Sequence, residues 1–560
     1  MAEEVWMLQT KKADFKQIGA RFRIDPVTAR IIRNRGIEGE AAIDRYLNGT
    51  LDDLYDPMLL KDMEHAVSIL CEAVDTGKKI RIVGDYDIDG VCSTYILLQA
   101  FERLGSDVDF EIPDRIKDGY GINESIIEQA HADGVEVILT CDNGISAFHQ
   151  VELAKKYGMT VVITDHHEVP LDGEKEKIPP ADAVIDPKQA DCPYPFPEIC
   201  GAVVAYKLVQ VLYARRGVPQ MEWLDLLEFA AIATVGDVMK LQDENRILVK
   251  YGLKKMAQTK NLGLRRLAEK NNLDLGAITA YHIGFVIGPC LNAGGRLKTA
   301  KEALALLRAQ SEEEAERLAE ELKELNDTRK DMTEQGTEAA KLQVESWYQK
   351  DKVLVVFLPE CHESLAGIIA GRLREYYQKP AIVLTRGEEA VKGSGRSIDE
   401  YHMFKKLTEV SDLLLKFGGH PLAAGLSLEE KNIDEFRRRL NENAGLTEED
   451  FKAKVWIDVP MPVGYVTERL VRELSCLEPF GQGNEKPLFA EKSLRIRASR
   501  VLGRNRNVVK MTLEETDGHA IEALYFGDGT AFEEERAGRR EIDVVYYPDI
   551  NEYNGRKTLQ

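Results

Sequence analysis

The sequence lacks long uncharged apolar runs. A membrane-spanning helix needs roughly 18 such residues in a row, and no run in the 560 residues is that long. The first residues, MAEEVWMLQTKK, contain acids and no apolar core, so they do not form a secretory signal. We therefore expect a cytoplasmic protein that does not bind membranes.

Cysteine pairs at metal-binding spacing are also missing. The eight cysteines are scattered along the chain, and none forms a CxxC pair. In a sequence without a secretory signal, such cysteines are expected to be reduced thiols. This composition excludes the small disulfide-stapled domains and the thiolate zinc sites.

An excess of positive charge is absent, because 74 lysines and arginines face 95 aspartates and glutamates, for a net charge of −21. This balance argues against a nucleic-acid partner only weakly, since an enzyme needs no more than a local basic groove. One stretch is basic, SLRIRASRVLGRNRNVVK at 493–510, and contains no acid. Its basic residues are Arg495, Arg497, Arg500, Arg504, Arg506 and Lys510. A basic strand face suits a single-stranded backbone.

The chain is too long for one hydrophobic core, so several domains are expected. Residues 78–190 alternate short β-branched runs with helical patterns, which predicts a mostly parallel sheet with crossover helices. Residues 190–300 read as largely helical. A long charged helix begins at Ser311, where Ser311 and Glu314 predict a capping box. This helix is expected to be a rigid spacer between lobes.

A second α/β segment follows the helix, and short strands follow that. The strand-like runs from Ala453 onward, KVWIDVP, SLRIRASRVL, NVVKMTL, HAIEALYF and EIDVVYY, favour a small OB-like β-barrel. We predict an N-terminal region at 1–45, a catalytic α/β domain at 46–300, a connecting helix at 301–350, a second α/β domain at 351–450 and the barrel at 451–560. Asn554-Gly555 is a hairpin turn signal with only a short return strand after it, so the natural protein is expected to continue further.

Each predicted strand of the first domain has an aspartate at or near its end. These are Asp85, Asp114, Asp142, Asp165 and Asp186. In open parallel sheets, ligands bind beyond the carboxyl ends of the strands. A single aspartate there is commonly a helix cap, but several unpaired like charges at one edge repel each other. We therefore expect a cation among them.

The run GDYDIDG at 84–90 has three aspartates at alternate positions. It opens like an EF-hand loop, but that loop needs an acid at its twelfth position, where this chain has Ile96. With TCDNG, TDHHEVP and ATVGDVM, the run supplies carboxylates and imidazoles that suit Mn²⁺ or Mg²⁺ better than zinc. Two such ions can activate a water and neutralise a phosphoryl group. A helix starting near Val91 would point its N-terminus at phosphate oxygens.

These motifs resemble a known family. GDYDIDG, TCDNG, TDHH and TVGD, in this order, are similar to the four metal-binding motifs of the DHH phosphoesterase superfamily, and FGGHPLAAG (417–425) is similar to the GGH signature of the DHHA1 domain. With the long helix and a terminal β-domain containing PFGQGNEKPLF (479–489), the whole chain resembles the RecJ family of single-strand-specific 5′→3′ DNA exonucleases. Val83 stands where some members of the family have a histidine.

The resemblance implies roles for individual residues. The direct ligands of two Mn²⁺ or Mg²⁺ ions would be Asp87, Asp89, Asp142, His166 and Asp237. Asp85 and His167 would lie beside them in a catalytic role, ligating an ion or orienting the attacking water. The 5′-terminal phosphate would be held by Arg115, Arg296, Ser394 and Arg396. Apart from the resemblance, we predict that Tyr120 stacks on a base and that His362 and His420 face the cleft between the lobes.

The expected function is metal-dependent hydrolysis of single-stranded DNA from the 5′ end to mononucleotides, in DNA repair and recombination, by a monomer. No GxxxxGK[ST] loop is present, so a partner helicase would have to open duplex DNA, and the family also implies a single-strand-binding protein. Two alternatives stay open. One is a phosphodiesterase acting on short RNA, cyclic dinucleotides or polyphosphate, and the other is a non-catalytic replication scaffold.

Overall fold

The computed structural model describes residues 4–553 and 555–560. These residues form two compact units. The first contains Leu54–Met239 and Ile247–Ala453, and the second contains Val5–Asp53, Lys240–Arg246 and Lys454–Gln560. Among the described residues, no helix has both the length and the apolar character needed to cross a membrane.

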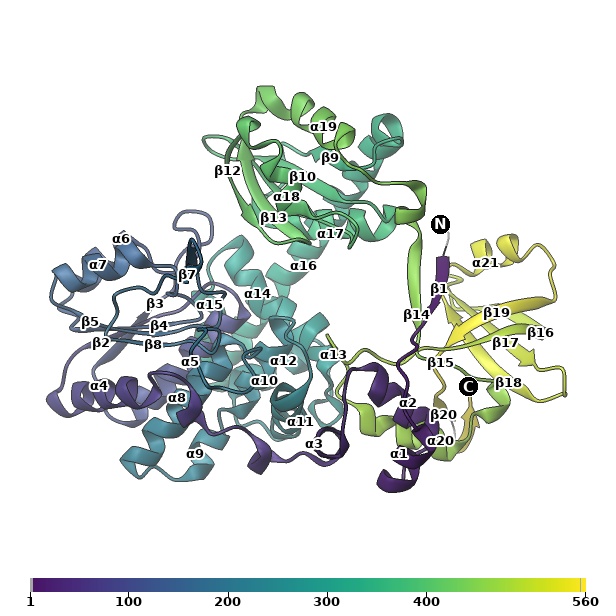
Figure 1. The fold of residues 1–560 in the computed structure, drawn as a ribbon, viewed down its shortest axis with the longest axis horizontal. Helices are drawn as coiled ribbons and strands as arrows, with labels where there is room; N and C mark the ends of the chain where they lie inside the picture. The colour runs from purple at the N-terminus through teal and green to yellow at the C-terminus, as the bar shows by residue number, and fades with distance from the viewer. Residues whose placement is uncertain (1–3, 554) are drawn as a thin grey trace. The chain divides into compact units, whose positions relative to one another are not determined.

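The first unit contains a five-stranded parallel sheet in the order β3-β2-β4-β5-β8. Its strands are β2 (Ile80–Val83), β3 (Val108–Glu111), β4 (Val137–Cys141), β5 (Thr160–Thr164) and β8 (Ala183–Ile185). Each lies in a run that the sequence predicts to be a strand. The helices α6 (Glu124–Ala132) and α7 (Phe148–Lys156) cover one face, and α4 (Met63–Thr76), α5 (Ile88–Arg103) and α8 (Gly201–Arg216) cover the other (Figure 1). Covering on both faces explains why β2 and β4 are mostly apolar and fully buried.

Helices fill the predicted helical region. They are α9 (Gln220–Leu224), α10 (Leu227–Gly236), α11 (Asp243–Met256), α12 (Leu262–Lys270), α13 (Ala280–His282), the π-helix η4 (Ile283–Ile287), α14 (Gly288–Leu297) and α15 (Lys301–Arg308). A small hairpin of β6 (Leu171–Asp172) and β7 (Lys175–Glu176) lies between β5 and β8 in sequence. The parallel strands bring their carboxyl ends to one edge, so the loops that follow them meet there.

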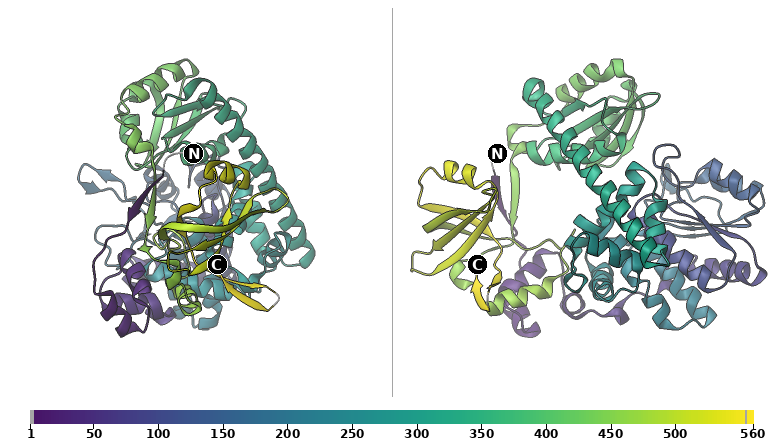
Figure 2. Two further views of the ribbon diagram at one scale, coloured as in Figure 1. Left: turned by 90° about the vertical axis from the view of Figure 1, so that its right-hand side faces the viewer. Right: turned by 180° about the vertical axis from the view of Figure 1, so that it is seen from behind.

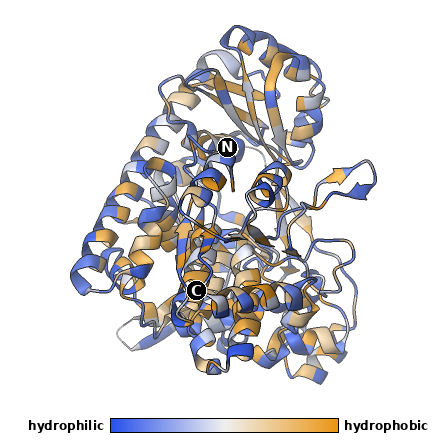
Figure 3. Cartoon of the chain, turned by 90° about the vertical axis from the view of Figure 1, so that its left-hand side faces the viewer, coloured by the Kyte–Doolittle hydropathy of each residue, from blue (hydrophilic) through white to orange (hydrophobic). Residues whose placement is uncertain are grey.

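The predicted long helix is α16 (Glu312–Gln343), of 32 residues. It packs on α12 and α14, which belong to the lobe with the parallel sheet, and on α17 (Ala366–Tyr377), which belongs to the second lobe described below (Figure 2). Most of its residues are hydrophilic (Figure 3), and its buried apolar residues include Ala315, Leu318, Ala319 and Leu322. The Ser311 Oγ accepts the Glu314 N–H at 3.1 Å, but the Glu314 carboxylate accepts the N–H of Gln310. The predicted capping box is therefore only half formed.

The second lobe of this unit is built on a mixed sheet in the order β12-β13-β11-β10-β9. Its strands are β9 (Leu354–Phe357), β10 (Ala381–Arg386), β11 (Val391–Arg396), β12 (Leu414–Gly419) and β13 (Ala423–Leu428), and its remaining helices are α18 (Met403–Thr408) and α19 (Ile433–Glu442). Only the β9–β10 pair is parallel. The residues Ser394 and Arg396 lie at the end of β11.

The second unit contains the OB-like sheet. Its strands are β15 (Val459–Pro460), β16 (Phe489–Leu502), β17 (Val508–Glu514), β18 (Ala520–Phe526) and β19 (Glu541–Tyr546), with α21 (Gly529–Arg536) between the last two. The N-terminal helices α1 (Phe15–Phe22), α2 (Pro26–Asn34) and α3 (Glu40–Asn48) share its core with α20 (Glu468–Leu474). The two ends of the chain thus form one hydrophobic core, which the sequence pattern does not predict.

One predicted barrel strand pairs elsewhere. The run KVWI lies in β14 (Ala453–Ile457), which pairs with β1 (Glu4–Leu8) and not with the barrel sheet. At the other end, β20 (Ile550–Tyr553) and β21 (Arg556–Leu559) form an antiparallel hairpin. The predicted turn between them includes Asn554, which lies outside the described residues.

Candidate metal centre and anion pocket

The loop after β2 carries the first three acids. Asp87 caps α5, because its Oδ1 accepts the N–H groups of Asp89 (2.8 Å) and Gly90 (3.1 Å). A Cβ at position 90 would lie 2.6 Å from the Asp85 carbonyl carbon, so only glycine lets the chain fold back this tightly. The loop therefore turns Asp85, Asp87 and Asp89 toward one place.

The loop after β4 adds Asp142, whose φ of 60° lies in the left-handed region. Such strain is typical of functional sites. The N-terminus of α8 packs directly on this residue, because a Cβ at Gly201 would lie 2.7 Å from the Asp142 Cβ. The N–H groups of Gly201 and Ala202 both donate to the Asp89 carboxylate at 2.7 Å. The N-terminus of α8 thus fixes the Asp89 carboxylate and lies against Asp142.

The loop after β5 carries the two histidines, and they point in different directions. The His166 Nε2 lies 3.1 Å from Asp142 Oδ1, 3.4 Å from Asp89 Oδ2 and 3.9 Å from Asp237 Oδ2. The His167 Nδ1 instead lies 2.7 Å from Asp165 Oδ1. His166 therefore faces the acids of the centre, while His167 is held by Asp165.

All seven residues predicted for the centre come together, from four separate segments. Their ligand atoms form three overlapping groups, each within 4.8 Å: Asp85, Asp87 and Asp142; Asp89, His166 and Asp237; and Asp142, His166 and His167. Asp237 is the C-terminal cap of α10. The shared members connect the three groups into one centre at the carboxyl edge of the sheet.

The electrostatics of the centre call for a cation. Burial, followed by the neighbouring acids, raises the pKa of Asp85 and of Asp237 to about 8, and the same causes raise the pKa values of Asp87 and Asp142. The buried Asp85 Oδ2 also has no hydrogen-bond partner among the described residues. Oxygen donors with one or two imidazoles fit Mn²⁺ or Mg²⁺, so the residues present suit these ions.

The other strand-end aspartates have different roles. Asp165 accepts the N–H of Ile145 at 2.8 Å. Although burial opposes it, the hydrogen bond and charge of His167 hold the pKa of Asp165 below its usual value. Asp165 therefore orients His167. Asp186 caps a turn by accepting the Lys188 N–H (2.8 Å), and Asp114 caps the loop ahead of Tyr120. Neither belongs to the three groups.

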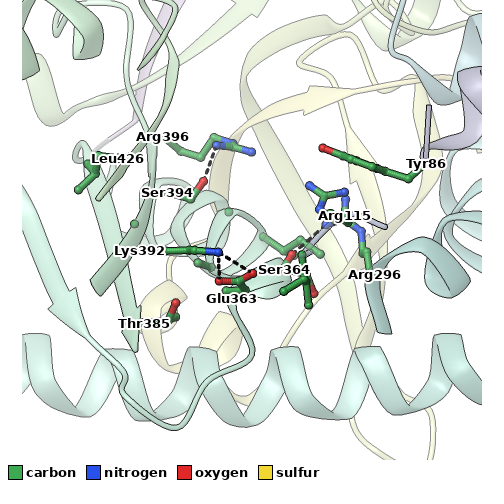
Figure 4. Close-up of a pocket in the computed structure, with 16 residues that line it drawn as sticks. Tyr86, Arg115, Arg296, Glu363, Ser364, Thr385, Lys392, Ser394, Arg396 and Leu426 are labelled. Carbon is green, nitrogen blue, oxygen red and sulfur yellow. Dashed lines mark hydrogen bonds and ion pairs between the residues drawn. The ribbon is translucent and has the colours of Figure 1, made fainter. Parts of the chain in front are cut away.

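Beside the centre lies a cavity of about 570 Å³, which we call the anion pocket. All four residues predicted to hold a phosphate line it: Arg115, Arg296, Ser394 and Arg396 (Figure 4). The Arg396 Nη1 donates to Ser394 Oγ (3.2 Å) and to the Gly395 carbonyl (2.8 Å). The Arg296 Nη1 donates to the Ser364 carbonyl at 2.9 Å. These contacts fix the guanidinium groups at the pocket wall.

The N-terminus of α17 also faces the anion pocket. A Cβ at Gly367, in its first turn, would lie 2.9 Å from both Arg396 Nη2 and Ser394 Oγ. Glycine therefore allows β11 and α17 to approach closely at the pocket wall. Burial, followed by the charge of Arg115, lowers the pKa of Arg296 to about 10, and burial lowers the pKa of Arg396. The three arginines thus give the pocket a surplus of positive charge, because the acid in its lining, Glu363, is paired with Lys392.

The sequence did not identify Tyr86 as a site residue. Its ring lines the anion pocket, with the Arg115 guanidinium 4.7 Å from the ring centroid. Figure 4 shows its side chain pointing into the pocket. Its position between Asp85 and Asp87, in the loop after β2, was the available signal. Lys392 and Glu363, an ion pair at 2.9 Å, also line the pocket and were not predicted.

The remaining predicted substrate residues lie around these sites. The Tyr120 hydroxyl donates to the Asp142 carbonyl at 2.7 Å and lies 3.1 Å from His167 Nδ1, so it is held at the metal centre. The His362 Nδ1 lies 2.7 Å from the hydroxyl of Ser364, which lines the pocket. His420 is exposed in the turn between β12 and β13 and is not part of the pocket lining.

The basic residues at 493–510 lie on the OB-like sheet and its turn, where most of them are exposed. Two of them are partly neutralised, because Arg497 pairs with Glu514 and Lys510 pairs with Glu522. The positive surface is therefore weaker than the sequence alone predicts.

Three family models match the chain. The DHH family, N-terminal domain, matches residues 79–234, the DHHA1 domain matches 350–445, and the RecJ OB domain matches 457–560. The order of the three agrees with the predicted order of domains, whose exact bounds stay a prediction.

Full-length relatives are similar to the chain as well. The single-stranded-DNA-specific exonuclease RecJ of Bacillus subtilis (strain 168) is 36% identical over 560 residues, covering 99% of this chain and 70% of the relative. The crystal structure of RecJ from Thermus thermophilus in complex with Mn²⁺ superposes with a TM-score of 0.84 at 29% identity, covering 100% of this chain and 78% of that one. The corresponding Mg²⁺ complex gives a TM-score of 0.77 at 28% identity, covering 100% and 77%.

Proposed function

The chain belongs to the RecJ family of single-stranded-DNA-specific exonucleases, and from this premise we propose that it removes nucleotides one at a time from the 5′ end of single-stranded DNA. The observation that carries the proposal is the pairing of two sites with opposite charge. A centre of acids and imidazoles lies next to a pocket of arginines. Tyr86 connects them, because it lines the pocket and lies in the loop that carries Asp85 and Asp87.

The acidic centre would hold two divalent cations. Asp87, Asp89, Asp142, His166 and Asp237 are proposed as their ligands, with Asp85 and His167 beside them. When bound, Mn²⁺ or Mg²⁺ supplies an activated water and neutralises charge on the scissile phosphate. The α8 N–H groups that hold Asp89, and the Asp165 carboxylate that holds His167, keep these side chains in place.

The anion pocket would hold the 5′-terminal phosphate. Arg115, Arg296 and Arg396 supply charge-assisted hydrogen bonds, and Ser394 adds a neutral donor. Tyr86 lines the pocket and is the residue between Asp85 and Asp87 in the sequence. A phosphate held in the pocket would therefore place a nearby phosphodiester at these acids. This arrangement supports release of one nucleotide per cleavage.

The test compares strands that differ only in the 5′ group. A 3′-labelled single strand with a 5′ phosphate is expected to be digested with Mn²⁺ and not with EDTA, and faster than the same strand with a 5′ hydroxyl. A duplex control should persist. Arg396→Ala should remove the preference for the 5′ phosphate, whereas Arg386→Ala, an exposed arginine paired with Glu430, should keep it. Digestion from the 3′ end, or equal digestion of both 5′ groups, would contradict the proposal.

The proposal includes several further expectations. The enzyme would work in the cytoplasm as a monomer, with a helicase to open duplex DNA and a single-strand-binding protein on the substrate. Adding RNA dimers, cyclic dinucleotides and polyphosphate to the same assay tests the alternative of a small-substrate phosphodiesterase. Faster turnover of any of these than of single-stranded DNA would favour that alternative.

A further inference from the structure

The first unit contains a second cavity, of about 460 Å³, among α5, α8, α10 and the turn before α12. We call it the α10 cavity. None of its lining residues belongs to the metal centre or to the anion pocket. It is therefore a separate site of a size that holds a small molecule.

A buried carboxyl group without a full set of partners lies in the α10 cavity. Glu228, in the first turn of α10, is 3% exposed. Its Oε1 accepts the Thr259 hydroxyl at 2.7 Å, while its Oε2 is buried and has no hydrogen-bond partner among the described residues. Burial raises the pKa of Glu228 to about 7. Because a buried acceptor without a donor is unfavourable, this oxygen is suited to a ligand that brings N–H groups.

Aromatic residues form the wall beside it. The Tyr95 and Phe229 rings have centroids 4.3 Å apart. The Tyr95 hydroxyl accepts an N–H from the Asn261 side chain at 3.1 Å, so its own hydrogen is left to donate to a ligand. The floor of the cavity thus offers an acceptor, a donor and flat apolar surface together.

The rim carries a surplus of positive charge. The Asp225 carboxylate is shared by Lys255 and by Lys260, the latter at 3.5 Å with its side chain 83% exposed. The neighbouring Arg103 is balanced by Glu222 at 2.5 Å. The two lysines share one acid, so the rim has one positive charge in excess, which an anionic ligand held by both lysines can neutralise.

We propose that the α10 cavity binds a guanine nucleotide, with the base at Glu228 and the phosphate at Lys255 and Lys260. Guanine has two adjacent N–H groups, which match a carboxylate, and a carbonyl oxygen that can accept from Tyr95. Adenine has no pair of adjacent N–H donors on its edge and matches less well. An occupant would contact α5 and α10, the helices whose ends carry Asp87 and Asp237.

The test measures binding without metal, so that its result does not depend on nuclease activity. The full-length chain with Arg396→Ala, which weakens the anion pocket, is titrated with dGMP in EDTA by calorimetry. We expect one site, with dAMP binding about tenfold more weakly. Adding Glu228→Gln should weaken dGMP about tenfold, because an amide N–H group then faces the base. Adding Lys255→Ala with Lys260→Ala should weaken dGMP but not guanosine.

The fold of each variant is checked by thermal melting. Glu228→Gln is expected to fold, because it removes a buried acid that lacks a donor. The proposal is overturned if dGMP does not bind at about 1 mM, if Glu228→Gln binds it as well as the parent does, or if dAMP and dGMP bind equally.

Discussion

Both carboxylate oxygens of Asp89 accept backbone N–H groups of α8, so its orientation is fixed before any cation binds. Its neighbours Asp85, Asp142 and Asp237 have pKa values raised by burial and then by the charges of nearby acids, mainly Asp87 and Asp89. A divalent cation relieves this repulsion, whereas protonation relieves it only by removing the charge that ligation needs. Individual residues of the centre are thus held for a cation by the surrounding helices.

Replacing Asp89 by asparagine should therefore reduce the rate of Mn²⁺-dependent digestion by about three orders of magnitude, because a direct ligand of a catalytic ion is lost. The amide keeps the size of the side chain and an acceptor for α8. The matched control is Asp107→Asn, at the amino end of β3 on the opposite edge of the sheet. It should digest single strands normally, and undiminished activity of Asp89→Asn would contradict the assignment.

Glu228 gives a prediction about stability and pH. Its pKa is about 7 in the folded chain against an ordinary 4.5, so the folded chain binds more protons than the unfolded chain between these values. The free energy of unfolding therefore falls as pH rises from about 4.5 to 7, by at most about 3 kcal/mol at this site.

Glu228→Gln removes the ionisable group, so the fall in the free energy of unfolding with rising pH is absent at this site. The melting temperature of the variant should exceed that of the parent more at pH 8 than at pH 5. Glu222→Gln is the control, because the Arg103 hydrogen bond lowers the pKa of Glu222. The change in melting temperature that it causes should be equal at pH 5 and pH 8. A Glu228→Gln difference that does not change with pH would show that Glu228 has an ordinary pKa.

At the scale of elements, the N-terminus of α17 forms part of the anion pocket. Gly367→Ala should push Arg396 and Ser394 aside, because the added Cβ would lie 2.9 Å from each. The preference for a 5′-phosphorylated strand over a 5′-hydroxyl strand should shrink about tenfold, the loss of one or two charge-assisted hydrogen bonds.

The same helix contains a matched control. A Cβ at Gly371 would meet no atom within 4 Å, so Gly371→Ala should keep the preference and stabilise the helix by up to about 1 kcal/mol. If both variants behave alike in the 5′-phosphate assay, α17 does not contribute to the pocket.

Elements with strong local patterns were predictable, and those defined by distant contacts were not. The strands β2, β4 and β5 follow from apolar runs between turn signals, and the acids after them follow from parallel topology. The pairing of β14 with β1 joins segments about 450 residues apart in sequence, which no local pattern encodes. Tyr86 was overlooked because the aspartates on either side explained the run without it.

At the scale of the whole molecule, the net charge of −21 is compatible with a DNA substrate because the positive charge is local. We propose that the arginines of the anion pocket bind the 5′ phosphate. Separately, Arg495, Arg500 and Arg504 of the OB-like sheet and its turn are exposed and could bind a phosphate backbone. Arg497 is less available, since Glu514 pairs with it.

Changing Arg495, Arg500 and Arg504 together to serine should weaken the binding of long single strands. The slope of log K against log salt should become shallower by about 0.7 per lost phosphate contact. Binding of a trinucleotide with a 5′ phosphate should be unchanged, and the same change at Arg438, which pairs with Glu435 and Glu442, should affect neither. An unaltered slope for long strands would exclude this face from the DNA path.

The measurement that tests the account most directly is anomalous diffraction from crystals of the chain soaked in Mn²⁺. We expect two peaks, about 3.5–4 Å apart, among Asp87, Asp89, Asp142, His166 and Asp237, and their loss in Asp89→Asn. A difference map without a peak at these side chains, or with its only peaks elsewhere, would contradict the central claim that this edge of the sheet binds the catalytic cations.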